Sequence, residues 1–317
     1  MIIPKNRLRR FWAILITCLI CWACTFLATQ VYAEYAFGLF IWLPFALGAV
    51  STMIYGFKSE ASRRECRNTA YYTLLTFCFG LLFFAFEGII CLIMAAPIGL
   101  FFTWLGFLLG YQGIKSTIIN PSLLAVVLII SVPAFMGFEY NYDRNNTAEN
   151  LRSVTTSIVI NTSPEKVWQN VIAFPQLREP TELLFKAGIA YPINAKIDGT
   201  GVGAVRHCNF STGSFVEPIT VWNQPNLLKF DVTNQPETMK EFSFYDLHPN
   251  HLHGYFVSKH GQFKLTKLPN GKTLLEGTTW YYNKIKPNLY WDLWSDYIVH
   301  KIHTRVLEHI KEEAEHR

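Results

Sequence analysis

The feature that most constrains this chain is a change of character near Glu139. The residues before it form long blocks rich in Leu, Phe, Ile and Trp, and a bilayer core requires roughly 20 such apolar residues per helix. The residues after it have the mixed composition and the strand patterning of a water-soluble domain. We therefore expect a membrane region over residues 1–138, a polar linker over 139–151 and one globular domain over 152–317.

Five apolar blocks predict an α-helical transmembrane bundle in the first region: Phe11–Thr29, Phe37–Phe57, Ala70–Phe86, Gly88–Tyr111 and Pro121–Phe138. The third block is short and meets the fourth at Glu87-Gly88, so the two form either a tight hairpin or one broken, re-entrant segment. Glu87 is then either an interfacial residue or an ionisable group inside the membrane, which is by default a functional candidate.

The positions of Lys and Arg in the short loops predict the orientation of the bundle. Basic residues precede the first block, separate the second from the third and follow the fourth, whereas the alternate loops carry none. The N-terminus is therefore predicted to be cytoplasmic. With five spans the globular domain lies on the opposite, extracytoplasmic side, and one span more or fewer would reverse this. The basic residues are Lys5, Arg7, Arg9, Arg10, Lys58, Arg63, Arg64, Arg67 and Lys115.

The net charge of +5 is concentrated in the membrane region. Residues 1–140 contain 9 Lys and Arg against 5 Asp and Glu, whereas residues 141–317 contain 19 against 18. A near-neutral domain argues against nucleic acid as its partner. The domain contains only Cys208, so no internal disulfide indicates its redox compartment.

The second region has the pattern of an α+β domain. A helix is predicted to begin at Pro164, after the capping residues Thr162 and Ser163, and to end before Phe174. Turn signals separate the predicted strands, and Pro269-Asn270-Gly271 predicts a hairpin. The strands are Ser153–Ile160, Val202–Phe210, Ser214–Trp222, Leu227–Val232, Leu252–Leu265 and Thr273–Asn283.

A long amphipathic helix is predicted to close the chain, over about Asn288–Glu315. Its apolar stripe is long enough to cover one face of a curved antiparallel sheet. Such a helix-grip arrangement leaves a cavity between sheet and helix, where apolar ligands commonly bind. The stripe consists of Trp291, Trp294, Ile298, Ile302, Val306 and Ile310.

The segments TSIVINTSPEKVWQNVIAFPQL and GVGAVRHCNFSTGSFVEPITVWNQPNLLKFDV, followed by the terminal helix, resemble the SRPBCC or START-like superfamily, and most of all its polyketide cyclase/dehydrase-like branch. The resemblance covers about Ser153–His316. It implies the helix-grip fold and a pocket for a hydrophobic ligand, but no single chemistry. The preceding spans are similar to those of bacterial proteins with a membrane-embedded N-terminus, which implies an integral protein of the bacterial inner (plasma) membrane.

The leading hypothesis is a membrane-anchored START-like domain that binds a hydrophobic or lipid-like ligand next to the bilayer. The alternative is a polyketide cyclase/dehydrase-like enzyme acting on a hydrophobic substrate, and a third possibility is a sensor that signals through the spans. The expected partners are membrane lipids and a small hydrophobic ligand. We expect neither a cofactor nor a resident metal.

Arg206 and Glu217 are the main candidates for ligand binding. They lie on two strands joined by a hairpin turn, at positions that a symmetrical hairpin brings together. A pair that points into the cavity can orient a polar group or serve in acid–base chemistry, whereas a pair on the outer face is a structural cross-strand ion pair. Aromatic residues are further candidates for the lining: Trp222, Phe256, Trp280 and Trp294.

Three groups of residues have both a functional and a structural interpretation. Cys18, Cys21 and Cys24 repeat every three residues, which fits either soft-metal ligation or ordinary helix packing. His251 and His253, which follow His248, would share a strand face and could hold a metal or lie exposed. His300 and His303, with Asp296, form either an acid–base or metal set or a solvated helix face.

Overall fold

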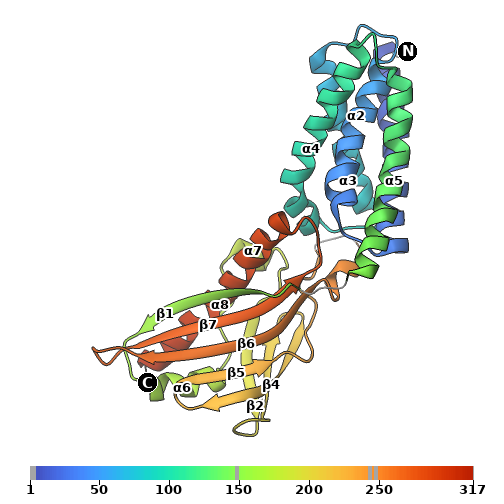
Figure 1. The fold of residues 1–317 in the computed structure, drawn as a ribbon. Coiled ribbons are helices and arrows are strands. Elements are labelled where there is room, and N and C mark those ends of the chain that lie inside the picture. The colour runs from blue at the N-terminus through green and yellow to red at the C-terminus, as the bar shows by residue number, and fades with distance from the viewer. Residues whose placement is uncertain (1–4, 147–149, 242–244, 246–248, 317) are drawn as a thin grey trace. The chain divides into compact units, whose positions relative to one another are not determined.

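The computed structural model describes residues 5–146, 150–241, 245 and 249–316 (Figure 1). The chain forms two compact units. The helical unit comprises residues 1–148 together with 241–251 and 285–287, and the sheet unit comprises 149–240, 252–284 and 288–317. Two short segments of the predicted domain 152–317 therefore belong to the helical unit.

The described residues of the helical unit form five α-helices: α1 (Lys5–Phe26), α2 (Leu43–Gly56), α3 (Arg63–Phe83), α4 (Ile89–Lys115) and α5 (Pro121–Asn145). Four helical segments of the described chain are long and apolar enough to span a membrane: Asn6–Tyr32, Gly38–Gly56, Ile89–Lys115 and Pro121–Asn145. They correspond to four of the five predicted spans. The remaining predicted span, Ala70–Phe86, falls on α3, which begins with basic residues and ends at Phe83.

Glycines allow close packing between α2 and α4. A Cβ atom on Gly106 would lie 1.9 Å from the carbonyl oxygen of Phe45, and one on Gly110 would lie 2.6 Å from that of Ala49. On the facing helix, a Cβ atom on Gly48 would lie 2.2 Å from the carbonyl oxygen of Thr103. Gly106 and Gly110 are four residues apart, which is the small-residue spacing typical of tightly packed membrane helices.

The predicted linker is wrong in its first part, because α5 continues through it to Asn145. Glu139 is buried and its carboxylate accepts a hydrogen bond of 2.8 Å from the backbone N–H of Gly38. The side-chain amides of Asn141 and Asn145 donate to carbonyl oxygens one turn earlier. These bonds make a polar, Asn-rich sequence compatible with a helix. Residues 147–149 of the linker lie outside the described residues.

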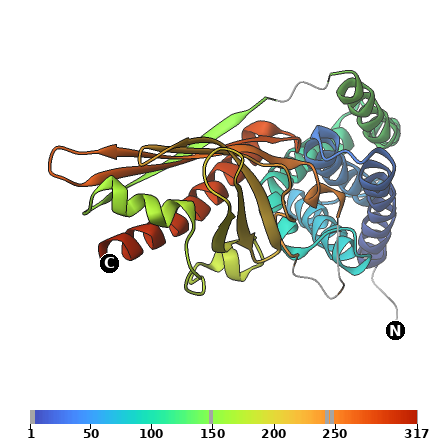
Figure 2. The same ribbon diagram turned by 90° about the horizontal axis from the view of Figure 1, so that it is seen from below.

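The sheet unit contains one antiparallel sheet with the strand order β1-β7-β6-β5-β4-β3-β2. The strands are β1 (Arg152–Ile160), β2 (Pro192–Asp198), β3 (Val205–Phe210), β4 (Gly213–Asn223), β5 (Leu227–Asp231), β6 (Phe256–Lys267) and β7 (Thr273–Asn283). The helices are α6 (Pro164–Ile172), α7 (Leu183–Lys186) and α8 (Asn288–His316). In Figure 2, α8 runs along one face of the strands, and it packs against β1, β7 and α6.

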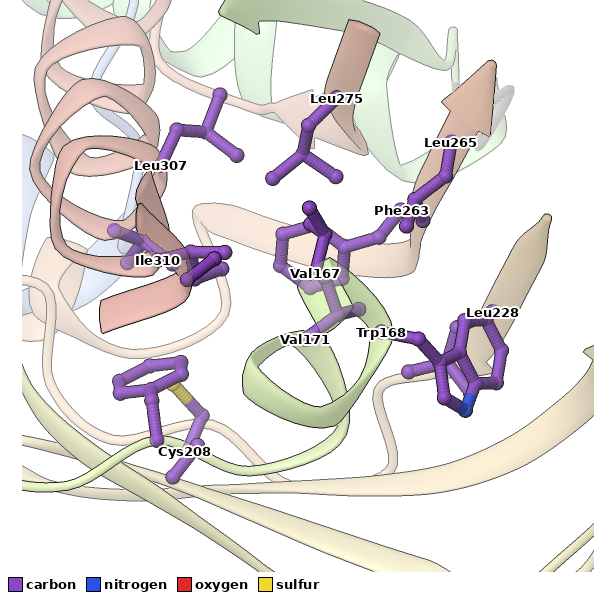
Figure 3. Packing of buried hydrophobic residues seen from close by; sticks show 14 of the residues in the cluster. Val167, Trp168, Val171, Cys208, Leu228, Phe263, Leu265, Leu275, Leu307 and Ile310 are labelled. Atoms are coloured by element: carbon purple, nitrogen blue, oxygen red, sulfur yellow. The ribbon is translucent and has the colours of Figure 1, made fainter. Parts of the chain in front are cut away.

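This arrangement confirms the predicted helix-grip fold. β2 and α7 were not predicted from the sequence, and β3 and β6 begin later than predicted. The core of the unit lies where α6 and α8 meet the sheet (Figure 3). Val167, Trp168 and Val171 of α6 are fully buried there, together with Leu307 and Ile310 of α8. The helix-start signal at Pro164 thus leads directly into the core.

Candidate functional site

The sheet unit contains a cavity of about 120 Å³ between the sheet and α8. Its walls come from β3 to β7 and from α8. Most of the lining is apolar, and aromatic rings dominate the sheet side: Phe210, Phe215, Phe230, Phe256 and Phe263. The predicted hollow beneath the terminal helix therefore exists, although its volume is small.

Arg206 and Glu217 lie directly opposite each other on β3 and β4, as the symmetrical hairpin predicts. Both side chains are buried, with 2% and 6% of their residues' surfaces exposed, and both line the cavity. The Arg206 guanidinium donates to the Glu217 carboxylate and, through Nε at 3.2 Å, to the carbonyl oxygen of Ile172. The interpretation as an ion pair on the outer face is therefore wrong, and the pair faces inward.

Aromatic rings surround the Arg206 guanidinium. Its Cζ atom lies 5.5 Å from the ring centroids of Phe174, Phe230 and Phe263, which is within the range of cation–π attraction. Burial raises the pKa of the Glu217 carboxyl group, and the positive charge of Arg206 opposes this shift. The rings and the carboxylate together hold a permanently charged group in a mostly apolar cavity.

A second polar group reaches the cavity from α8. His303 lines the cavity, and its Nε2 lies 2.7 Å from the hydroxyl oxygen of Thr279. Its Nδ1 lies 3.2 Å from the hydroxyl oxygen of Thr156, which also lies 2.8 Å from Nδ1 of His300. Burial, followed by the nearby His300, lowers the pKa of His303 to about 4. His303 is therefore a neutral, hydrogen-bonded imidazole at pH 7.

Asp296 does not join these histidines. Its carboxylate instead accepts a hydrogen bond of 2.5 Å from the Tyr281 hydroxyl and forms an ion pair of 2.7 Å with Arg152. The acid–base or metal set predicted from His300, His303 and Asp296 is therefore divided between two separate networks.

The aromatic candidates occupy different places. Phe256 lines the cavity, but Trp222, Trp280 and Trp294 are not among the described residues that line it. Trp222 packs edge-on against Trp168, with 5.7 Å between ring centroids. Trp280 lies half-buried on β7. Trp294 lies half-buried on α8.

The predicted pairing of His251 and His253 on one strand face is wrong, because β6 begins only at Phe256. His251 lies buried in a short 3₁₀ turn, whereas the side chain of His253 is 61% exposed and lies 3.1 Å from Glu237. His248 lies outside the described residues. Cys18, Cys21 and Cys24 are buried among the apolar side chains of the helical unit, as ordinary helix packing implies.

Two glycines of the lining were missed by the sequence analysis. A Cβ atom on Gly261 of β6 would lie 2.4 Å from the Phe230 ring, so only glycine leaves room for this ring. A Cβ atom on Gly277 of β7 would lie 3.6 Å from Leu307, which is an ordinary contact. A glycine inside a strand often marks a close approach of this kind, and this signal could have identified both positions.

No protein-family model matches the chain, and the search of curated proteins gave no match. Among solved structures, the Zhui aromatase/cyclase from a Streptomyces species is 12% identical, with 53% of this chain and 96% of that chain covered and a TM-score of 0.34. A truncated norcoclaurine synthase from Thalictrum flavum is 13% identical, with 52% and 94% covered and a TM-score of 0.32. XoxI from Bacillus cereus is 18% identical, with 50% and 93% covered and a TM-score of 0.33.

Removal of Arg206 alone should destabilise the sheet unit strongly. In Arg206→Ala, the buried Glu217 carboxylate loses its partner, and we expect the free energy of unfolding to fall by about 3–5 kcal/mol. The double variant Arg206→Met/Glu217→Leu should recover most of this loss, because it buries no unpaired charge. Thermal unfolding of the detergent-purified full chain, followed by circular dichroism, measures both changes. An Arg206→Ala protein as stable as wild type would contradict the buried pair.

The stability of the sheet unit should also fall on acidification, over the pH range between the unfolded and the folded pKa of His303. The imidazole pKa is 6.5 in the unfolded chain and about 4 in the folded one, so the unfolded state binds more protons between these values. The contribution of His303 is fully present above pH 6.5 and is lost as the pH falls towards 4. The variant His303→Gln, which cannot titrate, should show a shallower loss of stability from pH 6.5 to pH 4. Equal slopes in the two proteins would contradict the low pKa.

Proposed function

We propose that this protein, whose sheet unit has the helix-grip fold, binds a small hydrophobic molecule beneath α8 while its helical unit anchors it in a membrane. The cavity is the observation that carries the proposal. It combines aromatic and aliphatic walls with the buried pair of Arg206 and Glu217 and the neutral imidazole of His303, which is the usual character of a site for a mostly apolar ligand. Membrane lipids are the expected surroundings of the helical unit.

The cavity volume limits the size of the ligand. An apolar cavity of about 150 Å³ holds benzene, whereas pockets for drug-sized ligands measure about 300–1,000 Å³. A cavity of about 120 Å³ therefore suits a single ring or the end of an acyl or isoprenoid chain. A guanidinium has five N–H donors, so Arg206 can bind a ligand oxygen in addition to Glu217 and Ile172.

Filling the cavity should abolish ligand binding without unfolding the protein. In Gly277→Leu, the new Cβ atom makes ordinary contacts and the rest of the side chain enters the cavity. Native mass spectrometry of detergent-purified wild-type protein, with lipid analysis, should detect one co-purified molecule per chain. We expect Gly277→Leu to retain at least about tenfold less of it, which corresponds to roughly 1.4 kcal/mol of binding free energy.

The matched control is Glu276→Leu, which adds similar bulk at the neighbouring position of β7, where the side chain pairs with Lys264 at 3.6 Å. This variant should retain the ligand, because adjacent strand residues face opposite sides. If no molecule co-purifies with the wild-type protein, saturation-transfer NMR with toluene as a probe replaces native mass spectrometry as the measurement of binding. Equal binding by wild type and Gly277→Leu would place the ligand outside the cavity and contradict the proposal.

The inward-facing ion pair favours a second candidate function, a polyketide cyclase/dehydrase-like enzyme. Here Arg206 would polarise a substrate oxygen and Glu217 would transfer a proton. The variant Arg206→Met/Glu217→Leu distinguishes the two functions, because it removes both groups without leaving an unpaired charge. A binding protein carries a molecule of the same mass with or without the pair, even where the loss of Arg206 lowers the amount bound. An enzyme that eliminates water would leave the variant loaded with a substrate heavier by one water than the wild-type product.

We also propose that the N-terminus is cytoplasmic and that the sheet unit lies on the opposite side of the membrane. This requires α3 to cross as well. The helix has 21 residues and therefore a length of roughly 30 Å, which matches a bilayer core. Its basic residues lie in its first two turns, beside the loop that follows α2, as the positive-inside rule requires of a cytoplasmic loop.

Reporter fusions after Arg317 test this topology. We expect alkaline phosphatase, which is active only outside the cytoplasm, to be active there, and green fluorescent protein exported in unfolded form to be dark. A fusion in the loop after Gly56 should give the reverse pattern. Fluorescence at both sites would show that α3 does not cross, and the side of the sheet unit would then reverse.

A further inference from the structure

A buried polar cluster lies in the helical unit, where Glu241 and His251 meet the start of α4. Cys91 of α4 places its Sγ 3.0 Å from Nε2 of His251. Nδ1 of the same ring lies 3.7 Å from Oε2 of Glu87, which precedes α4. One ligand atom from each of these three residues lies within 4.8 Å of the others. The chain thus brings a thiol, an imidazole and a carboxylate together from distant parts of the sequence.

Two atoms of this cluster lack the partners that burial requires. Glu87 and His251 are 8% and 7% exposed. Oε2 of Glu87 and Nδ1 of His251 have no hydrogen-bond partner among the residues that the structure describes. Burying such groups without a partner is costly, and the exceptions in native proteins often mark a bound ion. The two atoms lie 3.7 Å apart, which exceeds a hydrogen bond, so the imidazole ring and the carboxylate do not satisfy each other.

The charges around the cluster favour a cation. Glu241 is also buried, and its carboxylate accepts hydrogen bonds of 3.2 and 3.3 Å from the backbone N–H groups of Ile90 and Cys91. A second carboxylate therefore lies beside Glu87, and the ion pairs of the described residues bring no Lys or Arg to either of them. A cation at this position would stabilise the ionised forms of the two carboxyl groups and the thiol, which burial otherwise disfavours.

We propose that Glu87, Cys91 and His251 bind a divalent transition-metal ion of the zinc type. One sulfur, one nitrogen and one oxygen donor form a mixed set that suits zinc, which binds all three in tetrahedral geometry. Bonds of about 2.3 Å to sulfur and 2.0 Å to nitrogen separate the two donors by roughly 3.5 Å. The Cys91 and His251 atoms therefore need to move apart by only a fraction of an ångström. Water or Glu241 can complete the fourth position.

The ion would link His251 to the start of α4. The chain leaves the sheet unit after Lys240, enters the helical unit at Glu241 and returns after His251. His251 also packs against Tyr35, with 4.8 Å between ring centroids, and Asn250 donates a hydrogen bond to the carbonyl oxygen of Thr29. A metal bond from His251 to Glu87 and Cys91 would add a strong link to these weaker contacts.

The same three residues have the order of a nucleophile, a base and an orienting carboxylate, but the geometry favours the metal. The separation of 3.7 Å between His251 and Glu87 exceeds a hydrogen bond. The N–H groups at the start of α4, which could stabilise an oxyanion, are already bound to Glu241. A small ion fits a buried cluster of this kind better than a substrate does.

Metal analysis of the detergent-purified full chain tests the proposal. After treatment with a chelator and addition of zinc, we expect one zinc ion per chain by mass spectrometry of the elements. Cobalt added instead should give the intense absorption of a cobalt–thiolate bond, which reports Cys91 directly. The variants Cys91→Ser, His251→Ala and Glu87→Gln should each weaken zinc binding by at least about tenfold, because even the loss of an outer-shell partner costs about 10–100-fold.

Two control variants should bind zinc as wild type does: Cys78→Ser, which removes another cysteine of the helical unit, and His253→Ala, which removes the exposed neighbouring histidine. The thermal midpoint of wild type should rise on zinc addition, and this measurement requires no variant to fold. A wild-type protein with no cobalt–thiolate absorption and no zinc-dependent stability would overturn the proposal. Zinc binding that survives Cys91→Ser would overturn it as well.

Discussion

The sheet unit depends on the covering of one face of its sheet by α8. An antiparallel sheet of seven strands has an apolar inner face that must be removed from water, and a single helix of 29 residues provides the cover. One helix fills the space unevenly, because it packs tightly against α6 near its end, where Leu307 and Ile310 are fully buried. Further towards its start, small residues on the strands leave the space partly empty. The cavity is thus a consequence of the architecture.

Gly261 and Gly277 determine where this space remains. They lie on the neighbouring strands β6 and β7, and neither has a side chain to fill the gap between sheet and helix. Gly261 also admits the ring of Phe230, which then contacts Arg206. A buried guanidinium is expensive unless it is paired, and here one carboxylate, one carbonyl oxygen and three rings share that role. The polar group in the cavity and the space beside it therefore have a common structural origin.

The order of the main strands and helices could be predicted from the sequence, because turn residues and a strong helix-start signal separate them. β2 and α7 were missed, since β2 has a weak alternating pattern and α7 has only four residues. The pairing of Arg206 with Glu217 followed from the symmetry of the hairpin. The face of the sheet on which their side chains lie did not follow from it. A signal was nevertheless present, because alternation places Arg206 on the same face as Cys208 and Phe210, and Glu217 on the same face as Phe215 and Ile219.

The buried face of α8 was also predicted only in part. The predicted stripe contains the buried residues Trp291, Val306 and Ile310, but Trp294 and Ile298 lie at its edge and are half-buried. The buried face instead includes Asp292, Ser295 and Val299. Polar residues enter the buried face because Asp292 forms an ion pair of 3.3 Å with Arg152 on β1. A pattern based on hydrophobicity alone cannot include a position whose burial depends on a distant charge.

The cluster of Glu87, Cys91 and His251 lay beyond sequence reasoning for a different reason. Cys91 and His251 are separated by 160 positions, and nothing in the local pattern around either residue indicates the other. The segment that carries His251 has turn-like character, so its position depends on what it contacts and not on its own propensity. Polar groups from distant segments are buried together only where their interactions offset the free energy lost on desolvation. In this cluster Oε2 of Glu87 and Nδ1 of His251 have no hydrogen-bond partner among the described residues, and this is the observation from which the metal site is argued.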